Sequence, residues 1–137
     1  MTPSRRHDAS AARQRDAVTR VLYVGDDDVL ARRTRAALAT APAGPWLVDR
    51  RETVDEALAA LRAGGHDVCL VDLRVGGGRA LDFLRAARAR GVHLPTVVLA
   101  DGPLETRGTG VDVCMSSGLV GPESLADALS LALRRAA

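Results

Sequence analysis

The sequence predicts an α/β fold in which helices cover both faces of a parallel sheet. Short apolar runs alternate with stretches in which apolar residues recur every three to four positions, the pattern of successive strands and helices. The run from Val68 to Val71 is continuously apolar, as expected for a strand that is buried on both faces. Right-handed crossovers through helices place such strands parallel to one another.

Each element has its own sequence signal. The first helix is expected to end before Pro42, because proline lacks a backbone donor and its ring opposes continuation. Thr53 and Glu56 have capping-box spacing at the start of the second helix, and Gly64 permits the left-handed backbone that ends it. Strands are predicted near residues 21–24, 46–48, 67–73, 95–100 and 111–115, and helices over about residues 29–41, 54–63, 79–90 and from 122 onward.

Two connections depart from a simple alternation. Gly76 to Gly78 follow the third strand without the Lys-Ser/Thr pair of a P-loop, so we expect a flexible loop there. Nine residues separate Ala100 from Gly110, whereas a parallel crossover normally takes about a dozen or more including its helix. The fourth helix is therefore expected to be shortened to about one turn or missing.

The chain of 137 residues is expected to hold one folded domain, over residues 19–137. Residues 1–18 are charged and lack an apolar period that would hold them against a core. We expect them to form a disordered or weakly ordered, arginine-rich arm. Electrostatic docking is the alternative role for this arm.

The composition argues against several classes of partner. The formal net charge is +2, and the chain has one Trp, one Tyr and one Phe, so neither nucleic acid nor a membrane is expected as a partner. There is no signal-peptide pattern and no long apolar span, which predicts a soluble cytoplasmic protein. Cys69 and Cys114 lie in apolar runs and are expected to be buried, inert thiols.

Acidic residues follow two of the predicted strands. The run that ends at Val24 is followed by Gly25 and then Asp26, Asp27 and Asp28, and the third strand ends in Asp72. If both runs are neighbouring parallel strands, these carboxylates meet at one sheet edge, where ligands bind in open α/β sheets. Such an arrangement suits Mg²⁺ and a phosphoryl group. The alternative is that the acids cap the next helix, an interpretation that applies to Asp28 more than to Asp26.

The stretch from Val21 to Arg135 resembles the receiver domain of two-component response regulators. The resemblance is most specific over Val21–Asp27, His66–Arg74 and Leu94–Leu99. It implies a flavodoxin-like (βα)5 fold with strand order 2-1-3-4-5, here with helix 4 shortened or missing. It also implies that Asp72 is the phosphoacceptor, and that Asp26, Asp27, Asp72 and the backbone carbonyl of Arg74 share Mg²⁺.

The sequence departs from that family at the positions that stabilise and read out the phosphoryl group. The first of the paired acids falls on Gly25, unless Asp27 turns inward to replace it. The hydroxyl, lysine and aromatic switch positions are Ala100, Ser117 and Cys114, and the chain has no lysine to compensate. Arginine is not equivalent to a compact ammonium group. We therefore expect an atypical receiver whose phosphorylation is weak or absent.

These observations leave two function classes open. The first is a stand-alone receiver-type signalling domain of a phosphorelay that binds a histidine kinase or phosphotransfer protein. The alternative is a phosphorylation-independent adaptor, or pseudo-receiver, that uses the same fold for protein contact. An enzyme is not expected, because an aspartate-nucleophile phosphatase usually carries a second Asp where this chain has Arg74. A homodimer through a non-standard surface, beside the fourth and fifth strands, is also considered.

Overall fold

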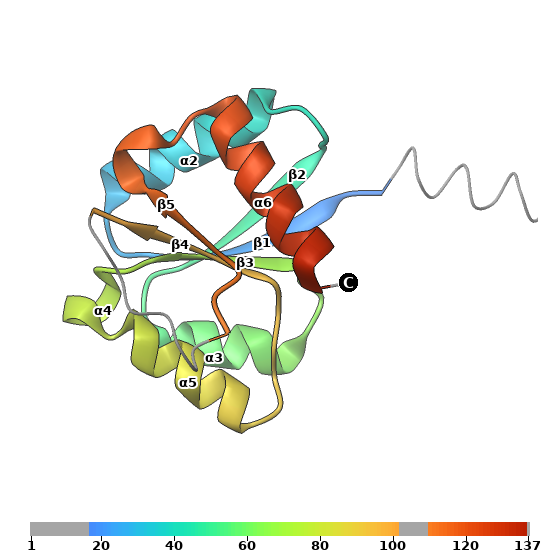
Figure 1. The fold of residues 1–137 in the computed structure, drawn as a ribbon. Coiled ribbons are helices and arrows are strands. Elements are labelled where there is room, and N and C mark those ends of the chain that lie inside the picture. Colours follow the sequence, from blue (N-terminus) through green and yellow to red (C-terminus); the bar gives the residue numbers. More distant parts are fainter. Residues whose placement is uncertain (1–16, 102–109, 137) are drawn as a thin grey trace, which may run out of the picture.

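Five parallel strands form the sheet at the centre of the structure, in the order β2-β1-β3-β4-β5 (Figure 1). The computed structural model describes residues 17–101 and 110–136. The strand order and the parallel pairing confirm the predicted α/β architecture. The strands are β1 (Thr19–Val24), β2 (Trp46–Arg51), β3 (Val68–Asp72), β4 (Thr96–Ala100) and β5 (Val113–Ser116).

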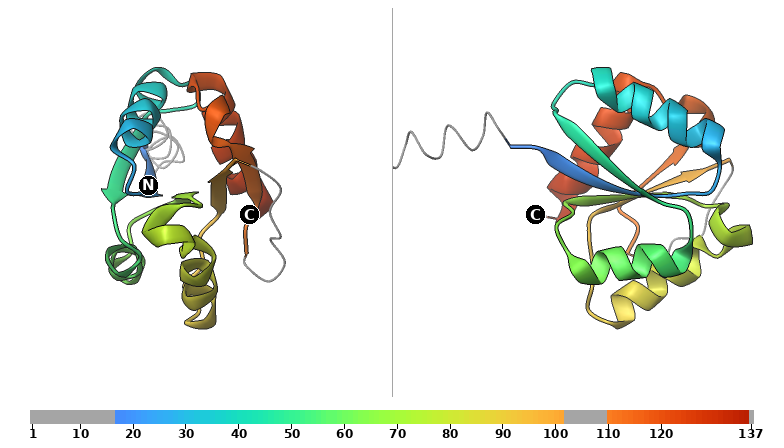
Figure 2. Two further views of the ribbon diagram at one scale, coloured as in Figure 1. Left: turned by 90° about the vertical axis from the view of Figure 1, so that its left-hand side faces the viewer. Right: turned by 180° about the vertical axis from the view of Figure 1, so that it is seen from behind.

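The helices form a layer on each face of the sheet (Figure 2). One face packs against α2 and α6, and the opposite face packs against α3 and α5. Each layer covers alternate residues of the strands, so the central strands β3 and β4 are buried on both sides. The helices are α2 (Asp28–Thr40), α3 (Val54–Ala63), the one-turn α4 (Val75–Gly78), α5 (Ala80–Ala89) and α6 (Pro122–Ala136).

The register of β1 and β3 positions the predicted site. Val24 pairs with Val71 in this parallel ladder, so the residues after Val24 and the end of β3 at Asp72 lie at the same edge of the sheet. Thr53 caps α3 by accepting from Glu56 N at 3.1 Å, as the capping-box spacing predicts. The acidic residues that follow β1 and β3 therefore meet at the carboxyl edge.

The glycine run after β3 forms a defined turn, where the sequence suggested a flexible loop. Gly76 and Gly77 have φ values of +60° and +72°, left-handed backbone that favours glycine. Val75 is fully buried beneath them, and its carbonyl accepts from Arg79 N at 3.0 Å. The buried side chain and this bond hold the turn against the molecule and lead directly into α5.

Cys114 is exposed, so the prediction that both cysteines are buried is wrong for this residue. Because β5 is an edge strand, Val113 and Met115 pack towards α6 while Cys114 lies on the opposite face. Cys69 is buried as predicted, and its burial raises the pKa of its thiol to about 12. Self-association beside β4 and β5 stays a prediction, and β4 itself is buried throughout.

Two expectations fall on parts of the chain outside the described residues. The shortened or missing fourth helix belongs to residues 102–109, and the charged arm is described only at residues 17 and 18. Among the helices in the described ranges, none combines the length and the apolarity needed to cross a membrane.

Candidate functional site

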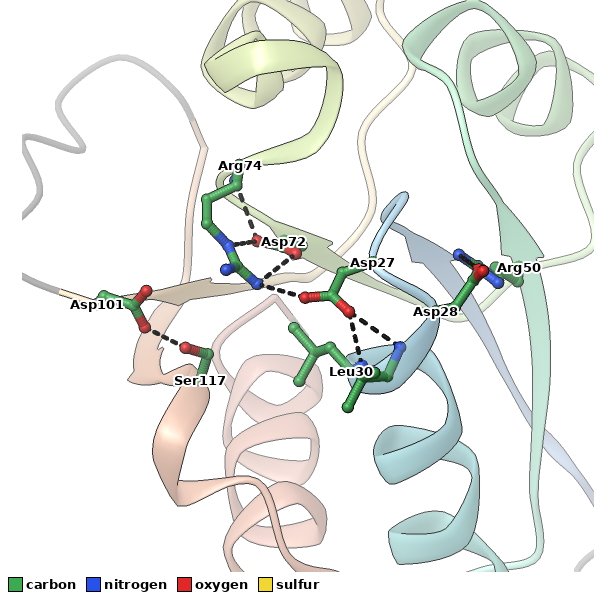
Figure 3. A network of polar contacts seen from close by, with 9 residues as sticks. Asp27, Asp28, Leu30, Arg50, Asp72, Arg74, Asp101 and Ser117 are labelled. Carbon is green, nitrogen blue, oxygen red and sulfur yellow. Dashed lines mark hydrogen bonds and ion pairs between the residues drawn. The ribbon is translucent and has the colours of Figure 1, made fainter.

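Asp72 lies at the end of β3 with its side chain only 1% exposed. Both of its carboxylate oxygens accept hydrogen bonds from Arg74, two residues further along the chain (Figure 3). Oδ1 accepts from the backbone N of Arg74 at 3.0 Å and from its Nε at 3.3 Å, and Oδ2 accepts from Nη2 at 3.2 Å. The proposed phosphoacceptor is therefore paired with a cation of its own chain.

The same guanidinium reaches a second carboxylate. Nη2 of Arg74 lies 3.2 Å from Oδ2 of Asp27, so one nitrogen bridges the residues that follow β1 and β3. The hydrogen bond to Asp72 and the negative charge of that residue raise the pKa of Arg74, and Asp101 and Asp27 add to the effect. Arg74 is thus a fixed positive charge, although its side chain is 54% exposed.

The two carboxylate oxygens of Asp27 accept hydrogen bonds from different parts of the chain. Oδ1 caps α2 by accepting from Val29 N at 2.9 Å and from Leu30 N at 3.1 Å, and Oδ2 faces Arg74. The backbone hydrogen bond from Leu30, together with those from Val29 and Arg74, holds the pKa of Asp27 below its usual value. The capping role considered for this acidic run belongs to Asp27, whereas Asp28 is exposed and pairs with Arg50 at 2.9 Å.

Asp26 points to the α4 turn. Its Oδ2 accepts from Gly76 N at 3.2 Å, which links the end of β1 to the segment that follows β3. The backbone carbonyl of Arg74, the remaining predicted metal ligand, accepts from Gly78 N at 3.2 Å. The structure thus brings the four predicted ligands to one edge of the sheet, and each accepts a hydrogen bond from an N–H group of the chain.

This arrangement does not fit a magnesium ion. Mg²⁺ requires oxygen ligands in near-octahedral geometry, but the facing oxygens of Asp27 and Asp72 are bridged by a nitrogen of Arg74. Within residues 17–101 and 110–136, no three acidic, histidine or cysteine side chains are grouped so that they could hold a metal ion. Arg74 stands between the carboxylates that the sequence suggested as metal ligands.

The side chain of Tyr23 fills the space beside Gly25, the position of the missing acid. A Cβ atom at position 25 would lie 2.9 Å from Oη of Tyr23 and 3.3 Å from Cβ of Asp72, so no larger residue fits without movement. Burial, and then the charge of Asp72, raise the pKa of Tyr23 to about 12, so its hydroxyl stays neutral. Sequence reasoning found the missing acid but not the side chain that fills the adjacent space, although a tyrosine in the otherwise aliphatic run of residues 21–24 is a visible signal.

The ends of β4 and β5 carry the other departures from the receiver pattern. Ala100 is buried at the end of β4, and Cys114 is exposed on β5. The hydroxyl of Ser117 donates to the carboxylate of Asp101 (Figure 3). Ala100 and Cys114 line an open pocket of about 260 Å³ together with Asp101, Met115 and Ser116. The hydroxyl of Ser117, at the position of the receiver lysine, is thus hydrogen-bonded to Asp101 of the same chain.

Sheet order and site together define a flavodoxin-like α/β domain with an acidic carboxyl edge. Comparison with solved structures narrows the fold further: the chain has the fold of response-regulator receiver domains. A CheY-like receiver domain protein from Methanospirillum hungatei JF-1 superposes with a TM-score of 0.72 at 18% identity, covering 87% of this chain and 96% of that one. The chemotaxis response regulator CheY4 of Vibrio cholerae gives 0.73 at 22% identity, covering 85% and 100%.

A higher sequence identity is found with the protein ShkA. Full-length ShkA in complex with AMPPNP is 33% identical with a TM-score of 0.70, and the match covers 82% of this chain but only 24% of that one. This chain thus corresponds to about a quarter of that protein. No protein-family model and no curated protein sequence matches the chain.

Proposed function

We propose that the chain is a receiver-type signalling domain that binds a histidine kinase or phosphotransfer protein, with Asp72 as a weak phosphoacceptor. The receiver fold and the position of Asp72 at the carboxyl end of the central β3 support this proposal. The pairing of Asp72 with Arg74 is the observation that carries the expectation of weak phosphorylation. The domain acts through protein contact, whether or not Asp72 carries a phosphoryl group.

The transfer reaction needs a free oxygen of Asp72. In the proposed step, that oxygen bonds to the phosphorus of a partner phosphohistidine, the phosphorus–nitrogen bond breaks, and the imidazole leaves with the electron pair. Both oxygens are engaged by Arg74, so its side chain must move before the reaction. Losing one group that stabilises the charge of the transition state typically slows a reaction by about 10² to 10³. This chain has Ala100 and Ser117 at the two positions where the receiver pattern has a hydroxyl and a lysine.

A small acyl phosphate donor tests the acceptor role. We expect incubation with acetyl phosphate and Mg²⁺ to add one phosphoryl mass to a small fraction of the protein, because Arg74 competes for the Asp72 oxygens. Intact mass spectrometry measures the increment, which should disappear in Asp72→Ala. Asp49→Ala is the matched control, because Asp49 also pairs with an arginine two residues later.

A second function is favoured if no increment forms. All four predicted metal ligands are already hydrogen-bonded within the chain, which supports a phosphorylation-independent adaptor. In that case Asp72→Ala should bind the partner kinase with the affinity of the wild type. An increment that persists in Asp72→Ala would contradict the assignment of the acceptor under either function.

A further inference from the structure

We propose that Arg74 is an internal counter-ion that excludes divalent cations from the Asp72 site. This inference rests on the proposed receiver function, which gives the site its meaning, and extends it by naming what occupies the site at rest. The direct observation is that Nη2 of Arg74 lies 3.2 Å from an oxygen of Asp27 and 3.2 Å from an oxygen of Asp72. One positive group thus takes the central position between two carboxylates.

Geometry makes this pairing specific. The guanidinium presents Nε and Nη2 to the two oxygens of Asp72, the fork-shaped contact that arginine forms with carboxylates. The backbone N of the same residue donates to Oδ1 as well, which orients the carboxylate independently of the side chain. Asp72 is buried, so water competes poorly for its oxygens. Arg74 therefore satisfies Asp72 without an added ion.

The surrounding contacts reinforce this arrangement. The carboxylate of Asp26 accepts from Gly76 N, and the carbonyl of Arg74 accepts from Gly78 N, so both are tied to the α4 turn. A cation bound by all four predicted ligands would have to displace the guanidinium and disturb this turn. The positive charge of Arg74 opposes the approach of that cation. Removal of this charge leaves the facing carboxylates of Asp27 and Asp72 without their shared counter-ion.

The exposed position of Arg74 allows it to act as a gate. Its side chain is 54% exposed, so the guanidinium can rotate towards solvent without opening the core. A partner that presents a carboxylate or phosphate near this edge offers Arg74 another anion. Withdrawal of the guanidinium then frees the Asp72 oxygens. The gate and the acceptor are thus separable parts of the same site.

Magnesium titration of Arg74→Gln tests the proposal without any phosphoryl donor. Backbone amide shifts in NMR spectra report binding, and we expect saturable shifts at Asp26, Asp27 and Asp72. The apparent affinity should exceed that of the wild type by about tenfold or more, the ratio for loss of a charge-assisted contact. Arg85→Gln is the matched control, because Arg85 is 53% exposed and also pairs with an aspartate. It should bind like the wild type.

Equal Mg²⁺ affinity of wild type and Arg74→Gln, or shifts located elsewhere, would overturn the proposal. Arg74→Lys keeps the charge without the fork and should bind Mg²⁺ more weakly than Arg74→Gln; equal binding would also overturn it. This second variant retains a positive partner for Asp72 should the neutral one fold poorly. A failed acetyl phosphate reaction beside a clear gain of Mg²⁺ binding in Arg74→Gln would reject the acceptor function and leave the counter-ion role intact.

Discussion

The same aspartate–arginine contact forms on the edge strand β2 and at the end of the central strand β3. In β2, Arg51 Nε and Nη2 contact Oδ1 and Oδ2 of Asp49, both at 3.2 Å. After β3, Arg74 makes the equivalent contacts with Asp72 at 3.3 and 3.2 Å. Asp49 and Arg51 are each 39% exposed, whereas Asp72 is 1% exposed. The local chemistry is alike and the burial of the acid differs.

Topology causes this difference. β2 is an edge strand with a neighbour on one side, while β3 lies between β1 and β4 with helices on both faces. In β2, a spacing of two residues places Asp49 and Arg51 on one face of the strand. Arg74 follows the end of β3 in helical backbone and still reaches Asp72, so the pair forms in both settings. Its energetic weight depends on whether water can reach the carboxylate. The Asp49–Arg51 pair, on the edge strand, is a surface contact. The Asp72–Arg74 pair, at the end of the central strand, determines the state of the candidate site.

Arg74→Gln against Arg51→Gln gives the largest expected contrast in stability. Removing Arg74 leaves a buried carboxylate with its backbone bond alone, which should lower the free energy of unfolding by about 1–3 kcal/mol. Removing Arg51 leaves an exposed carboxylate that still contacts His66, so a loss of about 0.2–1 kcal/mol is expected. Urea denaturation at pH 7 measures both. Equal losses would show that burial of the acid does not distinguish the pairs.

The pH dependence of stability tests the pair on the edge strand β2, through the titration of Asp49. Partial burial opposes ionisation, but hydrogen bonds from His66 and Arg51 more than offset it and lower the pKa of Asp49. A carboxyl group with a lowered folded-state pKa contributes stability above its unfolded value of about 3.9 and loses it as pH falls through the folded value. The stability advantage of wild type over Asp49→Asn should therefore shrink below about pH 4.

Urea denaturation of both proteins between pH 6 and pH 2.5 measures this effect. The advantage is expected to be below about 1 kcal/mol, because the pair is partly exposed and screened by solvent. His66 Nε2 lies 2.8 Å from Asp49, and Arg51 is the other basic residue in contact with it. An advantage that grew as the pH fell towards 2.5 would contradict the assigned direction of the shift.

The sequence was sufficient for the framework of the site. Alternation of apolar runs and helical periods predicted the parallel sheet, and the receiver resemblance implied its strand order, which the structure confirms. The apolar run that Asp72 closes is β3. The side-chain role of Arg74 was missed, because the receiver resemblance assigned only its carbonyl, and a long side chain takes its direction from tertiary neighbours. Cys114 shows a different limit. The expected strand order already placed the fifth strand at the edge of the sheet, but its apolar run was interpreted as buried on both faces, and Cys114 is exposed.

Gly25, at the carboxyl edge of the sheet, also has a side-chain environment that the sequence did not predict. Its missing side chain reads as a lost ligand in the sequence, and the structure adds that Oη of Tyr23 fills the adjacent space. Tyr23 is in β1 and Gly25 directly follows that strand, yet their contact depends on how the tyrosine ring packs between the sheet and the helices α2 and α6. Contacts between neighbouring side chains were thus harder to predict than the placement of whole elements.

Ionic strength gives the smallest effect and separates screening from burial. Double-mutant cycles with Asp49→Asn and Arg51→Gln, and with Asp72→Asn and Arg74→Gln, isolate the coupling free energy of each pair. Raising NaCl from 0.05 to 1 M shortens the Debye length to about 3 Å, so the edge coupling, about 0.2–1 kcal/mol, should fall by a few tenths. The central coupling should keep a larger share, because buried charge is screened less. Equal fractional losses would place Asp72 in contact with bulk solvent and remove the physical basis for treating its pair as distinct.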